Sequence, residues 1–235
     1  MEKSTTEDIR QNFDTQVERF SNIETGQTTA IDSPLCMELI SKAAKLTNPK
    51  ASHIMDLGCG GGNYAVKVAS LFPHINCTLV DISSNMLKTA HKRVTEISNG
   101  KITTMQGDYR KLELGENQFD IITAGTTLHH LRGNEEWELV FENIYRALKP
   151  GGSFWINDIV VSETGDINDM MLSGWLSILK KQVSESEVKM YMDRYESEDT
   201  PRTLSYQLEL MKNIGYSKTI LLHKHFNFAA FGGIK

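Results

Sequence analysis

Residues 54–64 read Ile-Met-Asp-Leu-Gly-Cys-Gly-Gly-Gly-Asn-Tyr, and this stretch decides the fold. Its apolar start is typical of the end of a buried strand, its glycines of a tight turn, and the residues from Asn63 onward of a helix. A strand, glycine turn and helix in this order let a ligand reach bare backbone at the carboxyl edge of a parallel sheet. The stretch therefore predicts an α/β fold with a ligand site at that edge.

A second apolar run, Cys77–Val80, ends in Asp81, where a carboxylate can hold the two hydroxyls of a ribose. A dinucleotide fingerprint would need Gly or Ala at the position of Asn63. In addition, Asp56 would repel a pyrophosphate, whereas it would attract an α-amino group. The pattern favours a ligand with a ribose, an amino group and no phosphate, and S-adenosylmethionine (SAM) fits that description.

The composition limits the classes of function. A chain of 235 residues with 40% hydrophobic residues suits a single α/β domain over 1–235. Its formal net charge of −5 makes nucleic acid an unfavourable partner. Cys36, Cys59 and Cys77 have no metal-ligand spacing, and their odd number argues against a disulfide framework. A polar N-terminus and the lack of a long apolar run predict a cytoplasmic protein with no membrane partner.

From residue 53 onward, apolar runs alternate with amphipathic segments, which predicts a parallel sheet between helices. The first five strands are expected over residues 53–57, 76–80, 102–106, 119–124 and 153–157. Two final strands, 220–223 and 226–234, are separated by a turn too short for a parallel crossover, so we expect them to be antiparallel.

Two helical segments lie outside this alternation. Residues 1–47 predict an N-terminal helical cap, with helices over 6–22 and 35–46. Residues 163–200, rich in Met and aromatic side chains, follow the fifth strand at the ligand edge. They predict a helical lid that forms the acceptor pocket, and ordinary core packing is the alternative.

Three further positions are candidates for the site. Asp108 ends the third strand and could accept the exocyclic amine of adenine while Tyr109 covers the ring; a solvated strand end is the alternative. His129 and His130 follow the fourth strand, and either could act as a general base or simply pack. Because the two are adjacent, at most one is expected to face the ligand. No metal is expected, since no third ligand has convincing spacing to these histidines, and His223 with His225 looks like an ordinary strand alternation.

Taken in order, these motifs resemble those of class I SAM-dependent methyltransferases. The matching segments are 56–62, 81–87, 107–108, 119–122, 128–131 and 148–152. The resemblance implies a Rossmann-like sheet of seven mostly parallel strands with an antiparallel last strand and helices on both faces. It implies that Asp56, Gly58 and Gly60 line the methionine side of the cofactor and that Asp81 holds the ribose. Asp108 and Tyr109 would then contact the adenine, and Gly125 would lie near the sulfonium. The remaining cofactor-binding residues that we expect are Cys59, Ile82 and Met86.

The C-terminal third, 184–235, more loosely resembles the carboxy-SAM synthase branch. That family uses an arginine in the helix before its last two strands to hold the extra carboxylate, but this chain has Leu210 there, and only Arg202 is nearby. We therefore expect plain in-line methyl transfer to a small molecule. A carboxy-SAM type of enzyme and a non-catalytic SAM-binding module are the alternatives, and a nicotinamide dehydrogenase is disfavoured by Asn63 and Asp56. A homodimer through the helical additions is expected by analogy only.

Overall fold

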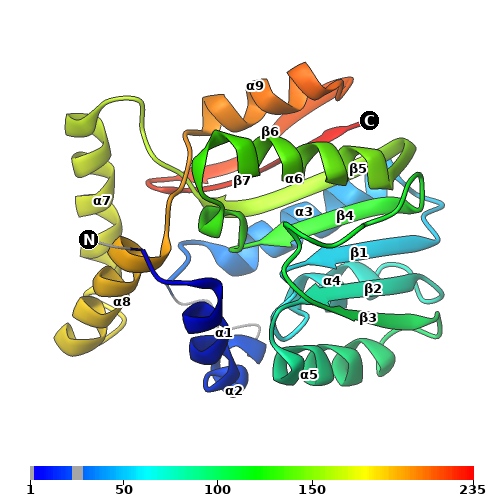
Figure 1. Cartoon of the computed structure of the whole chain (residues 1–235), viewed down its shortest axis with the longest axis horizontal. Coiled ribbons are helices and arrows are strands. Elements are labelled where there is room, and N and C mark those ends of the chain that lie inside the picture. Colours follow the sequence, from blue (N-terminus) through cyan, green and yellow to red (C-terminus); the bar gives the residue numbers. More distant parts are fainter. Residues whose placement is uncertain (1–2, 23–28) are drawn as a thin grey trace.

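A seven-stranded sheet forms the centre of the molecule in the computed structural model, which describes residues 3–22 and 29–235 (Figure 1). The strand order is β3-β2-β1-β4-β5-β7-β6. The strands are β1 (His53–Leu57), β2 (Asn76–Asp81), β3 (Ile102–Gln106), β4 (Phe119–Gly125), β5 (Leu148–Ile159), β6 (Lys218–His225) and β7 (Phe228–Ile234). Neighbouring strands pair in parallel from β3 through β2, β1 and β4 to β5. Strand β7 is antiparallel to both of its neighbours, β5 and β6. The predicted α/β fold with an antiparallel last strand is confirmed.

Helices cover both faces of the sheet. On one face lie α3 (Ser33–Thr47), α4 (Asn63–Ala69) and α5 (Ser84–Thr95), and on the other lie α6 (Gly133–Ala147) and α9 (Leu204–Ile214). Each helix presents an apolar stripe, and two separate clusters of buried side chains fill the space between the helices and the strands. Strands β1, β2, β4, β5 and β7 are buried over most of their length, which is why they read as continuous apolar runs in the sequence. The edge strands β3 and β6 are more exposed.

The fifth strand is longer than the sequence predicts. β5 begins at Leu148, which pairs with Phe119, and the register shifts before Ser153 pairs with Ile121. Pro150 and the following glycines conceal this start, because such residues normally mark a turn. The strand continues to Ile159 and so carries Asn157 and Asp158 to the ligand edge.

The N-terminal segment and the insertion meet at one end of the molecule (left and lower centre in Figure 1). The helix predicted over 6–22 is in fact two helices, α1 (Thr6–Asp14) and α2 (Val17–Ser21), with a break that the spacing of apolar residues does not reveal. The insertion forms α7 (Gly165–Leu179) and α8 (Glu185–Glu198), and α8 begins with a capping box of Ser184 and Glu187. The segment leading into α1 joins α8 through a hydrogen bond from Ser4 N to Ser197 O of 2.9 Å.

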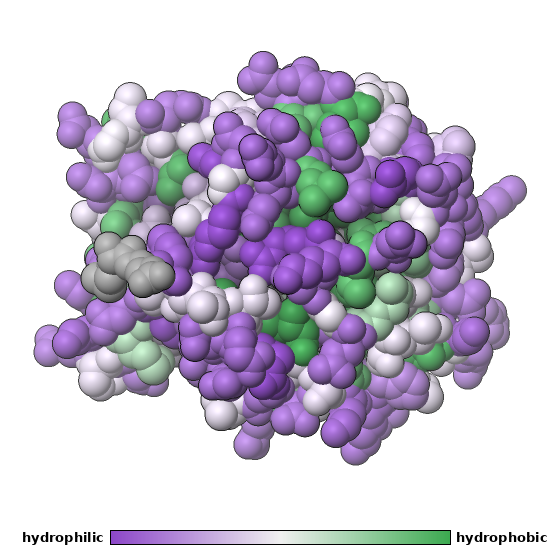
Figure 2. All heavy atoms as spheres, viewed as in Figure 1, coloured by the Kyte–Doolittle hydropathy of each residue, from purple (hydrophilic) through white to green (hydrophobic). Residues whose placement is uncertain are grey.

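The surface is mostly polar. Figure 2 shows hydrophilic residues over most of one face, with hydrophobic residues visible only in small separate areas. Within residues 3–22 and 29–235, no helix combines the length and the apolar character that crossing a membrane requires.

Candidate active site

Three strand-end carboxylates line one cavity at the carboxyl edge of the sheet. Asp56 lies in β1, Asp81 ends β2, and Asp108 follows β3. The other residues that the sequence predicts to bind cofactor line the same cavity: Gly58, Cys59, Gly60, Ile82, Met86, Tyr109 and Gly125. The fold therefore brings the whole predicted set to one place, although the segments that carry it are far apart in the chain.

Asp81 is held by backbone on both sides. Its Oδ2 accepts a hydrogen bond of 2.8 Å from Gly60 N, and its Oδ1 accepts one of 2.8 Å from Ser83 N. The side chain is buried, and burial raises its pKa above the usual value although these bonds oppose the shift. A carboxylate oriented in this way can accept further hydrogen bonds only from the cavity side.

Asp56 is almost completely buried, with 1% of its surface exposed. Its oxygens accept hydrogen bonds from Thr123 Oγ1 at 2.8 Å and from Ala65 N, in the first turn of α4, at 3.1 Å. Burial raises the pKa of Asp56 to about 7, and the two hydrogen bonds only partly oppose this rise. Such a buried carboxyl group is stabilised in its charged form by a cation, such as an amino group, in the cavity.

Asp108 has a protein partner that the sequence reading missed. Its two oxygens accept hydrogen bonds from the Arg110 guanidinium at 2.8 and 2.7 Å. Burial raises the pKa of Asp108, but the bonds from Arg110 outweigh it, so the net pKa lies below the usual value. Beside it, Tyr109 donates its hydroxyl hydrogen to Thr127 O at 2.9 Å, which fixes the ring at the cavity wall.

The glycine turn needs glycine for two different reasons. A Cβ on Gly58, with φ of +62°, would lie 2.2 Å from Thr127 Oγ1, whereas a Cβ on Gly60, with φ of +49°, would meet nothing within 4 Å. Overpacking costs about 1–3 kcal/mol, and the left-handed backbone adds about 1–2 kcal/mol. We therefore expect Gly58→Ala to lower the free energy of unfolding by about 2–5 kcal/mol and Gly60→Ala by only about 1–2 kcal/mol.

Urea unfolding of both variants would measure this difference. Because Gly60 lines the cavity, Gly60→Ala should weaken cofactor binding more than it weakens the fold. Equal losses of stability in the two variants would contradict the proposed steric role of Gly58.

Gly125 also accommodates a protein side chain. A Cβ there would lie 2.1 Å from Cε2 of Tyr64, so the ring of Tyr64 fills the space that the glycine leaves. The resemblance described above implies that position 125 lies beside the sulfonium. The close approach of Tyr64 is a further reason for glycine, and Tyr64 itself lines the cavity. In the sequence, Tyr64 looks like an ordinary first-turn residue of a helix, so no signal marks it.

His129 belongs to a hydrogen-bonded pair. It lies in the short 3₁₀ helix η1 (Leu128–His130), and its Nδ1 lies 2.5 Å from Oδ1 of Asp158 on β5. The other oxygen of Asp158 accepts a hydrogen bond of 2.8 Å from Leu128 N, which fixes the turn itself. Asp158 is buried, with 1% exposed, and the sequence analysis did not identify it because the predicted strand stopped at residue 157.

Both histidines line the cavity, so the expectation that at most one would face the ligand is wrong. The tight turn of η1 brings their ring centres within 4.2 Å of each other. Burial and the neighbouring charge of His129 hold the pKa of His130 well below its usual value. His130 is therefore neutral, while His129 differs from it because a carboxylate faces it on each side: Asp158 at Nδ1, and Asp199 with Oδ1 3.6 Å from Nε2.

This arrangement makes stability depend on pH. Burial lowers the pKa of His129, but the charges of Asp158 and Asp199 outweigh burial and raise the pKa to about 9. The unfolded value is 6.5. The group therefore contributes stability in full below pH 6.5 and loses it as the pH rises through 9. Over this pH window, we expect the free energy of unfolding of wild type to fall by on the order of 3 kcal/mol relative to that of His129→Gln. Urea unfolding at several pH values measures this difference. A difference that does not change with pH would contradict the assigned charge.

The insertion and the N-terminal helix supply the remaining wall. The aromatic residues on this side are Phe13, Trp175, Tyr191, Tyr195 and Phe228. Trp175 donates from Nε1 to Thr29 O at 2.8 Å, and Asn12 donates from Nδ2 to Glu198 Oε1 at 2.9 Å. The two segments thus contact each other and the chain near residue 29 around the cavity, and they give it a largely aromatic side.

The charges of the lining suit a cation. Among the described residues, five acidic side chains line the cavity: Asp56, Asp81, Asp108, Glu198 and Asp199. The two arginines of the lining are both paired, Arg110 with Asp108 and Arg194 with Glu198. A phosphate group would meet repulsion here, whereas a sulfonium and an amino group would be attracted. The buried carboxylates and the open backbone at Gly60 therefore fit SAM.

Two groups of side chains in the described part of the chain have the spacing of metal ligands. They are His129, His130 and Asp199 in the cavity, and Asp32, His223 and His225 outside it. In both groups the third residue lies far away in the chain, so spacing in the sequence does not reveal it. The expectation that this protein holds no metal stays a prediction.

Comparisons with known proteins show which family the central part of the chain matches. Residues 54–152 match the family model described as a methyltransferase domain. The carboxy-S-adenosyl-L-methionine synthase of Nautilia profundicola is 26% identical over 184 residues, which cover 77% of this chain and 76% of that protein. The demethylmenaquinone methyltransferase of Listeria monocytogenes is 32% identical over 104 residues, but these cover only 44% of this chain and 43% of that protein.

A solved structure supports the fold. Human N-acetylserotonin methyltransferase in complex with SAM has a TM-score of 0.56 and 19% identity, covering 98% of this chain and 67% of that one. At this identity the likeness concerns the fold alone. The family match identifies residues 54–152 as a methyltransferase domain of the class I, SAM-dependent kind. SAM is the cofactor of this class.

Proposed function

We propose that the whole chain is a SAM-dependent methyltransferase that acts on a small molecule. The observation that carries this proposal is a single cavity that combines the strand-end carboxylates, the pair of His129 and Asp158, and an aromatic wall. Bound SAM would supply an electrophilic methyl group on a charged sulfur. The protein then has to align the acceptor, exclude water and remove a proton where the acceptor atom carries one.

Each strand-end residue has a proposed part in holding the cofactor. Asp81 accepts from the ribose hydroxyls, and Asp56 faces the amino group beside the methionine side of the glycine turn. Asp108 and Tyr109 border the adenine, and the backbone near Gly125 lies beside the sulfonium. The backbone bonds to Asp81 and the hydrogen bonds to Asp56 support these parts, because they fix both carboxylates at the cavity.

For the acceptor, we propose His129 as the general base and Asp158 as the residue that orients it. Asp158 accepts from Nδ1 of His129, so the nitrogen that exchanges a proton with the acceptor is Nε2. We further propose that residues 1–47 act as a cap and 163–200 as a lid, and that their aromatic side chains select an acceptor with an apolar surface.

A second candidate is an enzyme of the carboxy-SAM type, which the similarity to the Nautilia enzyme favours. Against it, Leu210 is buried in the cluster between the sheet and α6, and no described residue of α9 lines the cavity. Mass spectrometry of the nucleoside that co-purifies with the protein separates the two: unmodified SAM or its demethylated product supports methyl transfer, and a carboxylated form supports the alternative.

The direct test is transfer of label from methyl-labelled SAM to fractions of a cell extract. Label in the small-molecule fraction supports the proposal, whereas label only in RNA or protein would contradict the small-molecule acceptor. No transfer to any fraction, despite tight cofactor binding, would favour a non-catalytic binding module. The net charge of −5 supports the small-molecule fraction. A homodimer and a cytoplasmic location stay predictions from the sequence.

A further inference from the structure

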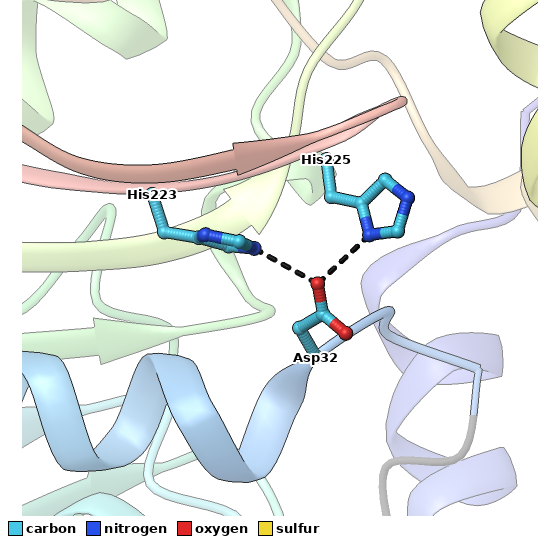
Figure 3. Close-up of side chains that lie close together, drawn as sticks. All are labelled: Asp32, His223 and His225. Atoms are coloured by element: carbon cyan, nitrogen blue, oxygen red, sulfur yellow. Dashed lines mark hydrogen bonds and ion pairs between the residues drawn. The ribbon is translucent and has the colours of Figure 1, made fainter.

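Asp32, His223 and His225 form a cluster outside the cavity, which we call the Asp32 cluster (Figure 3). One carboxylate oxygen, Oδ2 of Asp32, lies 2.9 Å from Nε2 of His223 and 2.8 Å from Nδ1 of His225. The two histidines are two positions apart on β6, so their side chains leave the strand on the same face. Asp32 reaches them from the residue immediately before α3, which packs over β6 and β7.

Asp32 contacts the two histidines and does not cap its own helix. It occupies the position before the first turn of α3, where an aspartate normally accepts a hydrogen bond from the helix backbone. Here no such bond forms, and the residue has a left-handed backbone with φ of 56°. Its carboxylate oxygen Oδ2 is instead shared by the two histidines.

The ligand set matches that of a transition-metal ion. Two imidazole nitrogens and one carboxylate oxygen are a common set for zinc and for other divalent ions of the first transition series. In a tetrahedral zinc site, neighbouring ligand atoms lie about 3.3 Å apart. The three ligand atoms of the Asp32 cluster already lie within 4.8 Å of one another, so small side-chain rotations would suffice to close it.

We propose that the Asp32 cluster binds a divalent transition-metal ion of the zinc class. The two N–H groups that now point at Asp32 would move to the other nitrogen of each ring, which frees Nε2 of His223 and Nδ1 of His225 for the ion. The side chains of Asp32 and His225 remain partly exposed, at 35% and 40%, so water can complete the coordination and the ion can exchange.

The ion would fix a wall of the active-site cavity. Thr29 and Ala30, just before Asp32 in the chain, line the cavity, and Thr29 O accepts the hydrogen bond from Trp175 of the insertion. Strand β6 belongs to the central sheet. A metal bridge from β6 to Asp32 would therefore tie the segment of residues 29–32 to that sheet. The bridge is a positioning device, and it does not depend on which acceptor the enzyme uses.

Calorimetric titration of the metal-free full chain with Zn²⁺ tests the proposal. We expect one equivalent to bind with micromolar or tighter affinity, and His223→Ala and His225→Ala each to weaken that binding at least tenfold. Co²⁺ should give a visible absorption spectrum that both variants lose. Controls are His91→Ala, on the exposed surface of α5, and His129→Ala, which disrupts the other group of three possible ligands. Loss of binding in a control instead, or no binding below about 100 μM, would overturn the proposal.

The substitution Asp32→Asn distinguishes a metal site from a contact that is held by hydrogen bonds alone. The amide oxygen can still accept from both histidines, so a contact that only needs an acceptor survives, but the charge that attracts the ion is lost. We expect this variant to keep the unfolding temperature of the metal-free protein and to lose most of the rise that Zn²⁺ produces in wild type, about 5 °C at a hundredfold excess over Kd. An equal rise in wild type and variant would contradict the proposal.

Discussion

His129→Gln should lower the turnover of methyl transfer by about 10²–10⁴-fold, the range that follows removal of a general base. The residue lines the cavity, and Asp158 fixes its ring through Nδ1. Glutamine fills similar space but cannot take up a proton. Cofactor affinity should change little, because His129 is not among the residues proposed to bind SAM. The measurement is kcat with the identified acceptor, together with the Kd for S-adenosylhomocysteine.

The pH dependence of kcat/KM tests whether His129 must be neutral to act. The raised pKa of His129, about 9, means that the neutral base is a minor form at pH 7 in the ligand-free protein. The value of kcat/KM should therefore rise about tenfold per pH unit and level off near pH 9. Asp158→Asn should move this limb to lower pH, while His130→Gln should leave it in place. A profile that falls above pH 9 would instead make the imidazolium a hydrogen-bond donor and would exclude His129 as the base.

Asp81→Asn should weaken binding of S-adenosylhomocysteine by about 10- to 100-fold, because a hydrogen bond to a charged acceptor contributes about 1.5–3 kcal/mol. Both oxygens of Asp81 accept from backbone, so the amide NH₂ of asparagine must face either Gly60 N–H or Ser83 N–H. The substitution thus removes the charge and also disturbs the turn that carries the cofactor. Calorimetry on the folded variant measures the loss.

Asp120→Asn is the matched control for this substitution. Asp120 lies at the start of β4, at the opposite edge of the sheet, and its Oδ2 accepts from Ser52 N and His53 N at 2.9 and 3.0 Å. The change has the same chemistry and also removes the ion pair of Asp120 with Lys149, but Asp120 does not line the cavity. We expect the Kd for S-adenosylhomocysteine to stay within about twofold of wild type, given the separation of the two sites. Similar losses in both variants would show that general destabilisation, not Asp81, explains the weaker binding.

Much of the fold could be predicted because its signals are local. The glycine turn after β1, the strand-end aspartates and the short turn before β7 each lie within a few residues, and together they determine the sheet and its ligand edge. The start of β5 was missed because Pro150 and its glycines look like a turn, and the break near Thr15 was missed because apolar spacing continues across it.

The rest of the site depends on contacts between distant segments, which one sequence does not reveal. Asp158 meets His129 from the neighbouring strand β5, Asp199 comes from the end of the insertion, and Asp32 meets His223 from the opposite end of the chain. Each of these carboxylates looks like an ordinary solvated residue in the sequence. Their effect on pKa and on possible metal binding arises only when the fold brings the partners together.

The central claim is that buried strand-end carboxylates form a site for a sulfonium nucleoside without phosphate. Calorimetry of the purified chain with S-adenosylhomocysteine and, separately, with NAD⁺ tests it most directly. We predict one equivalent of S-adenosylhomocysteine bound with a Kd in the micromolar range, and no heat of binding with NAD⁺. Tight binding of NAD⁺ without binding of S-adenosylhomocysteine would contradict the account.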